Sequence, residues 1–151
     1  MGTRSTITFI GKTGDKEVPY VKIYQQYDGY ISGIGYELAN FLKKRKIING
    51  ISNFNLNSNT ANGIGCLAAQ YIALKKTEVG GLYIDLIDSS DEYIDYCYKV
   101  IIDENKIPDM ADNITTIEVT NFGKDKIIFK GSPSDLLRFR EDEDEEEKEN
   151  E

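Results

Sequence analysis

The stretch that decides the fold is residues 20–42, YVKIYQQYDGYISGIGYELANFL. Its first five residues alternate between polar and apolar side chains, as on a half-buried strand. Its last nine residues repeat apolar side chains at helical spacing. The four that share this helical face are Ile34, Leu38, Phe41 and Leu42. The glycine-rich segment 25–35 therefore joins the end of a strand to the start of a helix.

The neighbouring segments predict a β-hairpin and a second helix. Residues 6–10 alternate like residues 20–24, and the turn-rich residues 11–16 separate the two runs, which is typical of a hairpin. Residues 47–61 are rich in Asn and Ser and are predicted to form a loop. A second helix is predicted from about Gly63 to Lys76. Its apolar face consists of Ile64, Leu67, Ala68, Tyr71 and Ile72.

The two predicted helices begin with the same tripeptide. Gly33-Ile-Gly35 recurs as Gly63-Ile-Gly65, and the apolar positions that follow keep the same offset of 30 residues. Two copies are too few for a solenoid, so a duplicated helical element and a coincidence both remain open. The repeat predicts that the two helices start in the same way.

The second half of the chain predicts more sheet. Residues 82–87 and 93–102 alternate on either side of a turn and predict one hairpin, and residues 115–119 and 127–129 predict another. Ser132 and Pro133 are typical N-cap and first-turn residues of a short closing helix. This order favours an α+β fold with a mainly antiparallel sheet, two consecutive helices packed on one face and a short C-terminal helix.

Charge and composition indicate one domain and exclude several chemistries. The 151 residues include no histidine, which excludes His-based catalytic dyads and triads and His-ligated zinc within this chain. Nine of the 26 acidic and one of the 18 basic residues lie in 141–151, so residues 1–140 carry 17 of each and are formally neutral. We expect residues 1–140 to form a single α+β domain and residues 141–151 a disordered acidic tail. The tail serves solubility or reaches a basic partner.

The sequence also indicates where the protein resides. It has no run of about 18 apolar residues, so no membrane span is expected. The N-terminus lacks the apolar core of a secretory signal, which predicts an intracellular protein with free thiols at Cys66 and Cys97. The neutral body and the acidic tail argue against direct nucleic-acid binding. We expect no cofactor.

The segment 25–35 is the strongest candidate for a binding site. Free backbone N–H groups and the positive end of the helix dipole favour an anion where a strand leads into a helix. Its glycines let a ligand approach the backbone, Asp28 and Ser32 can orient the ligand, and Tyr27 and Tyr30 can stack on a ring. The alternative interpretation is a tight turn with Ser32 as the helix cap.

Two further groups of residues can carry chemistry. Cys66 lies in the first turn of the second predicted helix, where a thiolate is stabilised, although a small core residue is the commoner role of such a cysteine. Asp85 and Asp95 face each other across the hairpin predicted for 82–102, where like charges are unfavourable. A bound cation, one protonated carboxyl group, a solvated face or a different register each resolve this conflict. We predict no metal site.

Two motifs near the N-terminus point to a family. They are Gly2-Thr-Arg-Ser5 and the loop Asp28-Gly-Tyr-x-Ser-Gly-x-Gly35, with a weaker contribution from residues 65–69. In these motifs the first 45 residues resemble a family of small proteins, without an assigned activity, that bacteriophages and large DNA viruses encode. This chain has Ile31 where that family often has proline. The resemblance implies a viral origin. If the family loop is functional, Arg4 lies near Asp28 as an ion pair or an anion clamp.

Three hypotheses about function follow. The first is a non-enzymatic viral accessory protein that binds a protein partner or a small anionic ligand. The second is an enzyme that acts on a nucleotide-like or an acyl or amide substrate, with Asp28 or Cys66 as the reactive group. The third is a structural component of the virion or virus factory, in which exposed tyrosines and a sheet edge support a homo-oligomer. We favour the first. The residues expected at the binding site are Arg4, Gln26, Tyr27, Asp28, Gly29, Tyr30, Ser32, Gly33, Gly35, Gly63, Gly65 and Cys66.

Overall fold

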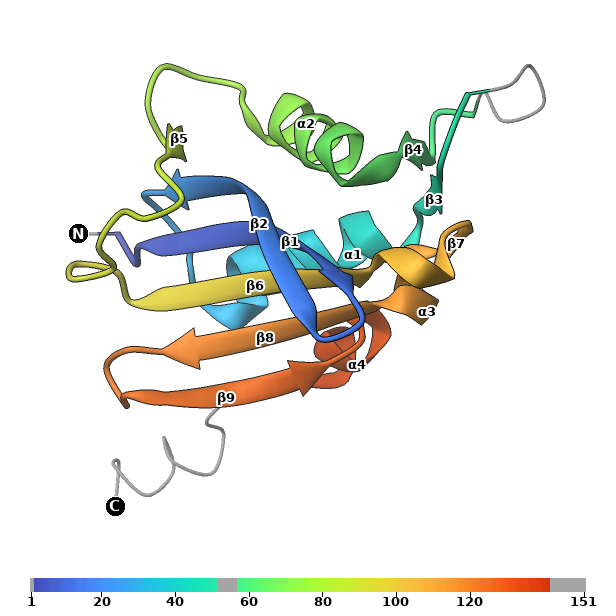
Figure 1. The fold of residues 1–151 in the computed structure, drawn as a ribbon. Coiled ribbons are helices and arrows are strands. Elements are labelled where there is room, and N and C mark those ends of the chain that lie inside the picture. Colours follow the sequence, from blue (N-terminus) through green and yellow to red (C-terminus); the bar gives the residue numbers. More distant parts are fainter. Residues whose placement is uncertain (1, 52–56, 142–151) are drawn as a thin grey trace.

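The computed structural model describes residues 2–51 and 57–141 (Figure 1). Its centre is a six-stranded sheet with the strand order β5-β2-β1-β6-β8-β9. The strands are β1 (Ser5–Thr13), β2 (Lys16–Gln25), β5 (Leu82–Asp85), β6 (Tyr96–Asp103), β8 (Thr115–Asn121) and β9 (Lys126–Gly131). Strands β1 and β6 run parallel, and every other neighbouring pair of this sheet runs antiparallel.

Helices and a smaller sheet surround this centre. The helices are α1 (Tyr36–Lys43), α2 (Gly63–Lys75), α3 (Ala111–Ile114) and α4 (Pro133–Arg138), with a π-helical turn η1 (Ile31–Gly35) before α1 and a 3-10 turn η2 (Glu104–Lys106) after β6. The smaller sheet has the order β4-β3-β7 and consists of β3 (Lys46–Ile48), β4 (Thr60–Asn62) and β7 (Asp109–Met110).

One face of the large sheet carries the hydrophobic core. Phe9 and Tyr98, both fully buried, belong to this core together with residues of the helices. The ring of Tyr71 in α2 lies 6.1 Å from that of Phe9 and 5.2 Å from that of Phe41 in α1, centroid to centroid. In Figure 1, α1 and α4 lie behind the sheet. The predicted α+β class, with a mostly antiparallel sheet, two consecutive helices on one face and a short C-terminal helix, is confirmed.

The elements that depend on neighbouring residues form as predicted. The first hairpin pairs β1 with β2 from Ser5 opposite Gln25 to Thr13 opposite Lys16, and β8 pairs with β9 in the same antiparallel way. The closing helix α4 begins with a capping box, because the Ser132 hydroxyl accepts from the Asp135 N–H at 3.1 Å while the Asp135 carboxylate accepts from the Ser132 N–H at 3.2 Å. These signals are local, so the sequence contains them in full.

The hairpin predicted for residues 82–87 and 93–102 is wrong. Strand β5 pairs with β2 at the sheet edge, so Asp85 lies opposite Lys22 instead of Asp95. Strand β6 pairs with β1 and β8 in the middle of the sheet. The two runs alternate as strands do, but partners far away in the sequence complete their hydrogen bonds, and residues 86–95 cross from the edge to the centre.

The loop predicted for residues 47–61 contains two short strands. Residues 46–48 and 60–62 form β3 and β4, which pair in parallel, and β7 adds an antiparallel partner. Ile47 and Ala61 are fully buried in the core, which explains why this polar stretch is anchored at both ends. Strands of three residues are too short to leave a periodic pattern in the sequence.

Four predictions about the chain as a whole have different outcomes. None of the helices within residues 2–51 and 57–141 is long and apolar enough to cross a membrane. The predicted disordered tail lies outside the described residues except for Glu141. The single domain predicted for 1–140 stays a prediction, and both Cys66 and Cys97 are free thiols as expected.

Candidate functional site

The N-terminal residues and the 25–35 loop pack against each other. The Gly29 N–H donates to the Thr3 carbonyl oxygen at 2.9 Å. A Cβ atom on Gly29 would lie 2.8 Å from the Cβ of Ser5, and one on Gly2 would lie 2.4 Å from the carbonyl oxygen of Gln26. Neither position has room for a side chain. The two motifs that carry the viral resemblance therefore form one packed unit.

Close packing also explains the glycines inside the loop. Asp28 adopts a left-handed backbone with φ of 60°, which Asp tolerates better than most residues. Its carbonyl oxygen accepts the Ile34 N–H at 2.8 Å, and a Cβ on Gly33 would lie 2.4 Å from that oxygen. A Cβ on Gly35 would lie 3.2 Å from the Tyr98 hydroxyl oxygen. These glycines thus serve the packing of the chain itself.

The loop uses backbone donors that an anion would need. Besides the Ile34 N–H, the Gly33 N–H donates to the Tyr30 carbonyl oxygen at 3.0 Å. The polypeptide enters the helix through the π-helical turn η1, for which Tyr30 is the N-cap residue without a side-chain cap bond. Ser32 is exposed inside this turn, so the alternative of Ser32 as a helix cap is wrong. The helix start is closed by carbonyl oxygens of the same loop.

Asp28 and Arg4 have separate partners. The Tyr30 hydroxyl donates to the Asp28 carboxylate at 3.2 Å. The Arg4 guanidinium donates to the Tyr93 carbonyl oxygen at 3.4 Å, and the Arg4 backbone N–H donates to the Asp95 carboxylate at 2.9 Å. Arg4 is therefore held by the segment that leads into β6, and within the described residues no ion pair joins it to Asp28.

Gly63, Gly65 and Cys66 lie elsewhere. They open α2, which starts beside β4 at the end of the sheet opposite the 25–35 loop (Figure 1). Gly63 has a φ of 80°, and a Cβ on Gly63 or Gly65 would meet nothing within 4 Å. The two Gly-Ile-Gly tripeptides thus begin their helices differently, one through a tightly packed π-helical turn and one in open space. Cys66 is half-buried and packs against the core.

Sequence reasoning named Arg4 and Tyr27 but missed Tyr24, Tyr83 and Tyr93, which the structure adds to them. Tyr27, Tyr83 and Tyr93 expose 56%, 51% and 73% of their surface. The rings of Tyr24 and Tyr83 lie 6.0 Å apart. We call Arg4, Tyr24, Tyr27, Tyr83 and Tyr93 the tyrosine patch.

Tyr24 lies near the charges of Arg4 and Asp95 and near the phenol groups of Tyr83 and Tyr27. Burial raises the pKa of Tyr24, the positive charge of Arg4 opposes that rise, and the nearby Tyr83, Asp95 and Tyr27 add to it. Tyr83 and Tyr93 come from segments about 60 and 70 positions further along the chain than Tyr24. The pairing of β5 with β2 places Tyr83 opposite Tyr24, and the contact with Arg4 holds the backbone at Tyr93. No local signal in the sequence indicates this.

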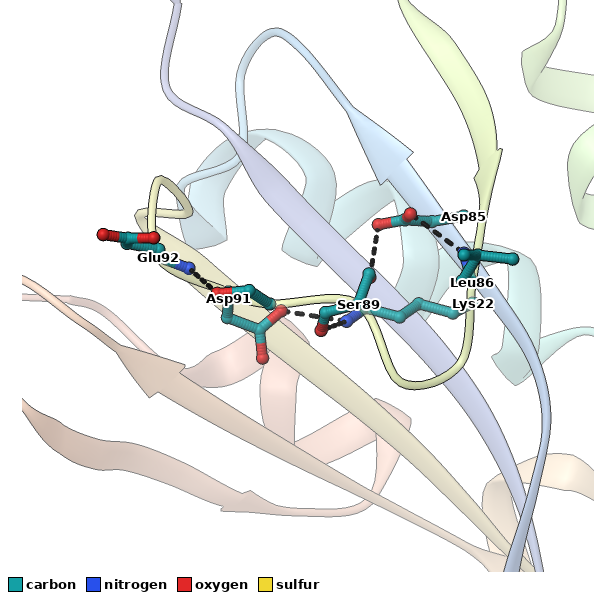
Figure 2. Close-up of polar contacts among 7 residues, drawn as sticks. Lys22, Asp85, Leu86, Ser89, Asp91 and Glu92 are labelled. Carbon is teal, nitrogen blue, oxygen red and sulfur yellow. Dashed lines mark hydrogen bonds and ion pairs between the residues drawn. The ribbon is translucent and has the colours of Figure 1, made fainter.

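A buried lysine holds the crossing segment in place (Figure 2). The Lys22 side chain is 5% exposed, and its ammonium donates to the Ser89 carbonyl oxygen and to the Asp91 carboxylate, each at 3.0 Å. The Ser89 hydroxyl donates to the Asp85 carboxylate at 2.8 Å. Buried charges are stable only when paired and hydrogen-bonded. This network fixes residues 85–91, and through them the position of Tyr93.

The comparisons with known proteins add no relative. Within the described residues, no group of three or more His, Cys, Asp and Glu side chains is placed to hold a metal ion. No protein-family model matches the chain, and none of the curated proteins or solved structures compared with it matches either.

Proposed function

We propose that this chain is a virus-encoded accessory protein that acts as a non-enzymatic binding module, and that it binds a protein partner through the tyrosine patch. The observation that carries this proposal is the exposure of three large aromatic side chains, each by more than half, around one arginine. Tyr and Arg are the residues that most often dominate binding energy at protein interfaces.

The patch stands on a rigid base, which favours tight binding. The Gly29 to Thr3 hydrogen bond holds the loop that carries Tyr27. The Lys22 network and the Arg4 contacts hold the segment that carries Tyr93. Little side-chain and loop freedom is therefore lost when a partner binds, so less of the interaction energy is consumed by ordering.

The alternatives are less well supported at this end of the sheet. The Gly33 and Ile34 N–H groups, two donors expected to bind a small anion at the 25–35 loop, already donate to carbonyl oxygens of the loop. The two alternative reactive groups of an enzyme, Asp28 and Cys66, belong to opposite ends of the sheet, so each would have to act without the other (Figure 1). A structural virion component would use the same patch to bind a second copy of this chain.

The test compares two variants that differ in where a tyrosine is lost. Tyr27→Ser combined with Tyr93→Ser removes two patch residues, and Tyr20→Ser removes an exposed tyrosine in the middle of β2, outside the patch. A partner is captured by the tagged wild-type chain, purified, and titrated against all three proteins by calorimetry. We expect the double variant to bind at least about tenfold more weakly and the Tyr20 variant to bind like the wild type.

Equal affinity of the double variant and the wild type would refute the proposal. Light scattering on the same proteins distinguishes the source of the partner. If the wild type forms a dimer that the double variant does not, the partner is a second copy of the chain and the structural hypothesis is favoured.

A further inference from the structure

A hollow of about 290 Å³ lies between the helix α2 and the edge of the large sheet formed by β2 and β5. Among its lining residues, only Lys22 and Asp85 are charged. The Lys22 ammonium is buried and already bonded to Ser89 and Asp91. The hollow is therefore mainly apolar. We define this edge hollow by six of its other lining residues, namely Tyr20, Gly65, Ala69, Ile72, Ile84 and Ile87.

The apolar side chains beside the edge hollow are exposed. Ile84 exposes 67% of its surface, Leu86 71% and Ile87 41%. Large apolar residues that gather at one place on a protein surface mark an interaction site. Successive side chains of a strand point to opposite faces, so Ile84 and Tyr83 lie on opposite sides of β5. The edge hollow is thus a surface separate from the tyrosine patch.

The backbone at this edge does not favour an added strand. Strand β2 contains Pro19, which has no N–H group, and Tyr20, an extra residue without a counterpart in the register of β1. At the two ends of β5, the Leu82 N–H donates to a carbonyl oxygen and the Leu86 N–H to a carboxylate, each at 2.9 Å. Such features protect a sheet edge from strand addition. A helix satisfies its own backbone groups and can bind to the same surface.

The charge around the edge hollow is negative. Residues 77–98 contain six carboxylates and no basic residue. Asp85 lines the hollow and Asp88 follows Ile87, and neither forms an ion pair within residues 2–51 and 57–141. The whole chain carries a net charge of -8, which repels a second copy. Charge complementarity therefore favours a basic partner.

From these observations we propose that the edge hollow binds a basic amphipathic helix of a protein partner, separately from the tyrosine patch. The apolar face of this helix packs on the exposed side chains of residues 84–87, and one of its aliphatic side chains enters the hollow beside Gly65. That wall has space, because a Cβ on Gly65 would meet nothing within 4 Å. The lysines or arginines of the helix face Asp88. Binding of an amphipathic helix in an apolar groove is a common mode of peptide recognition.

The test titrates two synthetic peptides into the isotope-labelled full-length protein and follows its amide resonances by NMR. Both peptides consist of Lys and Leu in the same proportions, but one places the leucines on one helical face and the other is scrambled. We expect the amphipathic peptide to cause saturable shifts within residues 63–72 and 82–88, with a dissociation constant of about 0.1 mM or below. The scrambled peptide measures attraction to acidic residues anywhere in the chain and should bind at least about tenfold more weakly.

A variant that fills the hollow tests the site directly. Gly65→Leu combined with Ala69→Leu places two larger side chains in the hollow and should weaken binding of the amphipathic peptide at least about tenfold. Asn40→Leu is the matched control, because it adds the same side chain at an exposed position of α1 outside the hollow, and it should bind like the wild type. Asp88→Asn should weaken binding by about two- to fivefold, as expected for one exposed ion pair.

The spectrum of each variant reports whether it remains folded. Equal binding of the two peptides, shifts confined to other residues, or undiminished binding by the Gly65 and Ala69 variant would each overturn the inference. The tyrosine patch is judged separately, because its test uses a captured partner and the variant that lacks Tyr27 and Tyr93. Tyr20 lines the edge hollow, so Tyr20→Ser should weaken binding of the amphipathic peptide although the partner of the tyrosine patch binds this variant like the wild type.

Discussion

Replacing Tyr98 by phenylalanine tests the structural role of the 25–35 loop. The Tyr98 hydroxyl is buried and donates to the Gly29 carbonyl oxygen at 2.7 Å. Phenylalanine keeps the ring but leaves the Gly29 carbonyl buried without this donor, which costs about 1–3 kcal/mol. We expect the free energy of unfolding to fall by about 2 kcal/mol. At roughly 3–5 °C per kcal/mol, the Tm would fall by about 6–10 °C.

Urea denaturation followed by circular dichroism measures this change, and Tyr93→Phe is the matched control. Tyr93 is 73% exposed, so its variant should differ from the wild type by less than about 0.5 kcal/mol. Gly35→Ala adds a coupling measurement, because its Cβ would lie 3.2 Å from the Tyr98 hydroxyl oxygen. That substitution should cost less in the Tyr98→Phe background than in the wild type. A Tyr98→Phe effect no larger than the control, or an equal cost of Gly35→Ala in both backgrounds, would refute the reasoning.

Three other expectations can be measured on the same purified protein. Burial raises the pKa of both Tyr71 and Tyr98 above that of an unfolded tyrosine, so their contribution to stability is complete below about pH 10 and is lost as the pH rises further. Absorbance at 295 nm should show these two tyrosines ionising only as the chain unfolds. Ionisation of both before unfolding would contradict this expectation. Gly33→Ala should destabilise the fold by about 1–3 kcal/mol, because its Cβ would lie 2.4 Å from a carbonyl oxygen. Gly65→Ala, in open space on a helix, should stabilise the fold by roughly 0.5–1 kcal/mol. A change in stability of the same sign for both variants in thermal unfolding would be inconsistent with the structure. Lys22→Met should lower stability by about 2 kcal/mol and speed proteolysis within residues 86–95, since the acceptors of its buried ammonium lose their donor. An unchanged rate of cleavage within these residues would argue that Lys22 does not hold this segment in place.

Parts of the site were predictable from the sequence, and parts were not. The glycine-rich composition of segment 25–35 identified it as a candidate site, and the segment contains the left-handed Asp28 and closely packed glycines. Its chemistry was misjudged, because donors expected to be free, those of Gly33 and Ile34, are used within the loop. Tyr83 and Tyr93 left no motif at all, since they lie far along the chain from Arg4.

The sequence by itself determined the elements whose information is local. The first hairpin, the helix α2, the hairpin of β8 with β9 and the capping box of α4 each depend on turns, periodicity and caps within about 20 residues. The tertiary structure alone decided which strand β5 and β6 would pair with. A strand has the same alternation of apolar and polar residues whichever strand it pairs with, and burial of the shared core selects the partner. That choice brings Tyr83 and Tyr93, from distant parts of the chain, to the end of the sheet where Arg4 lies.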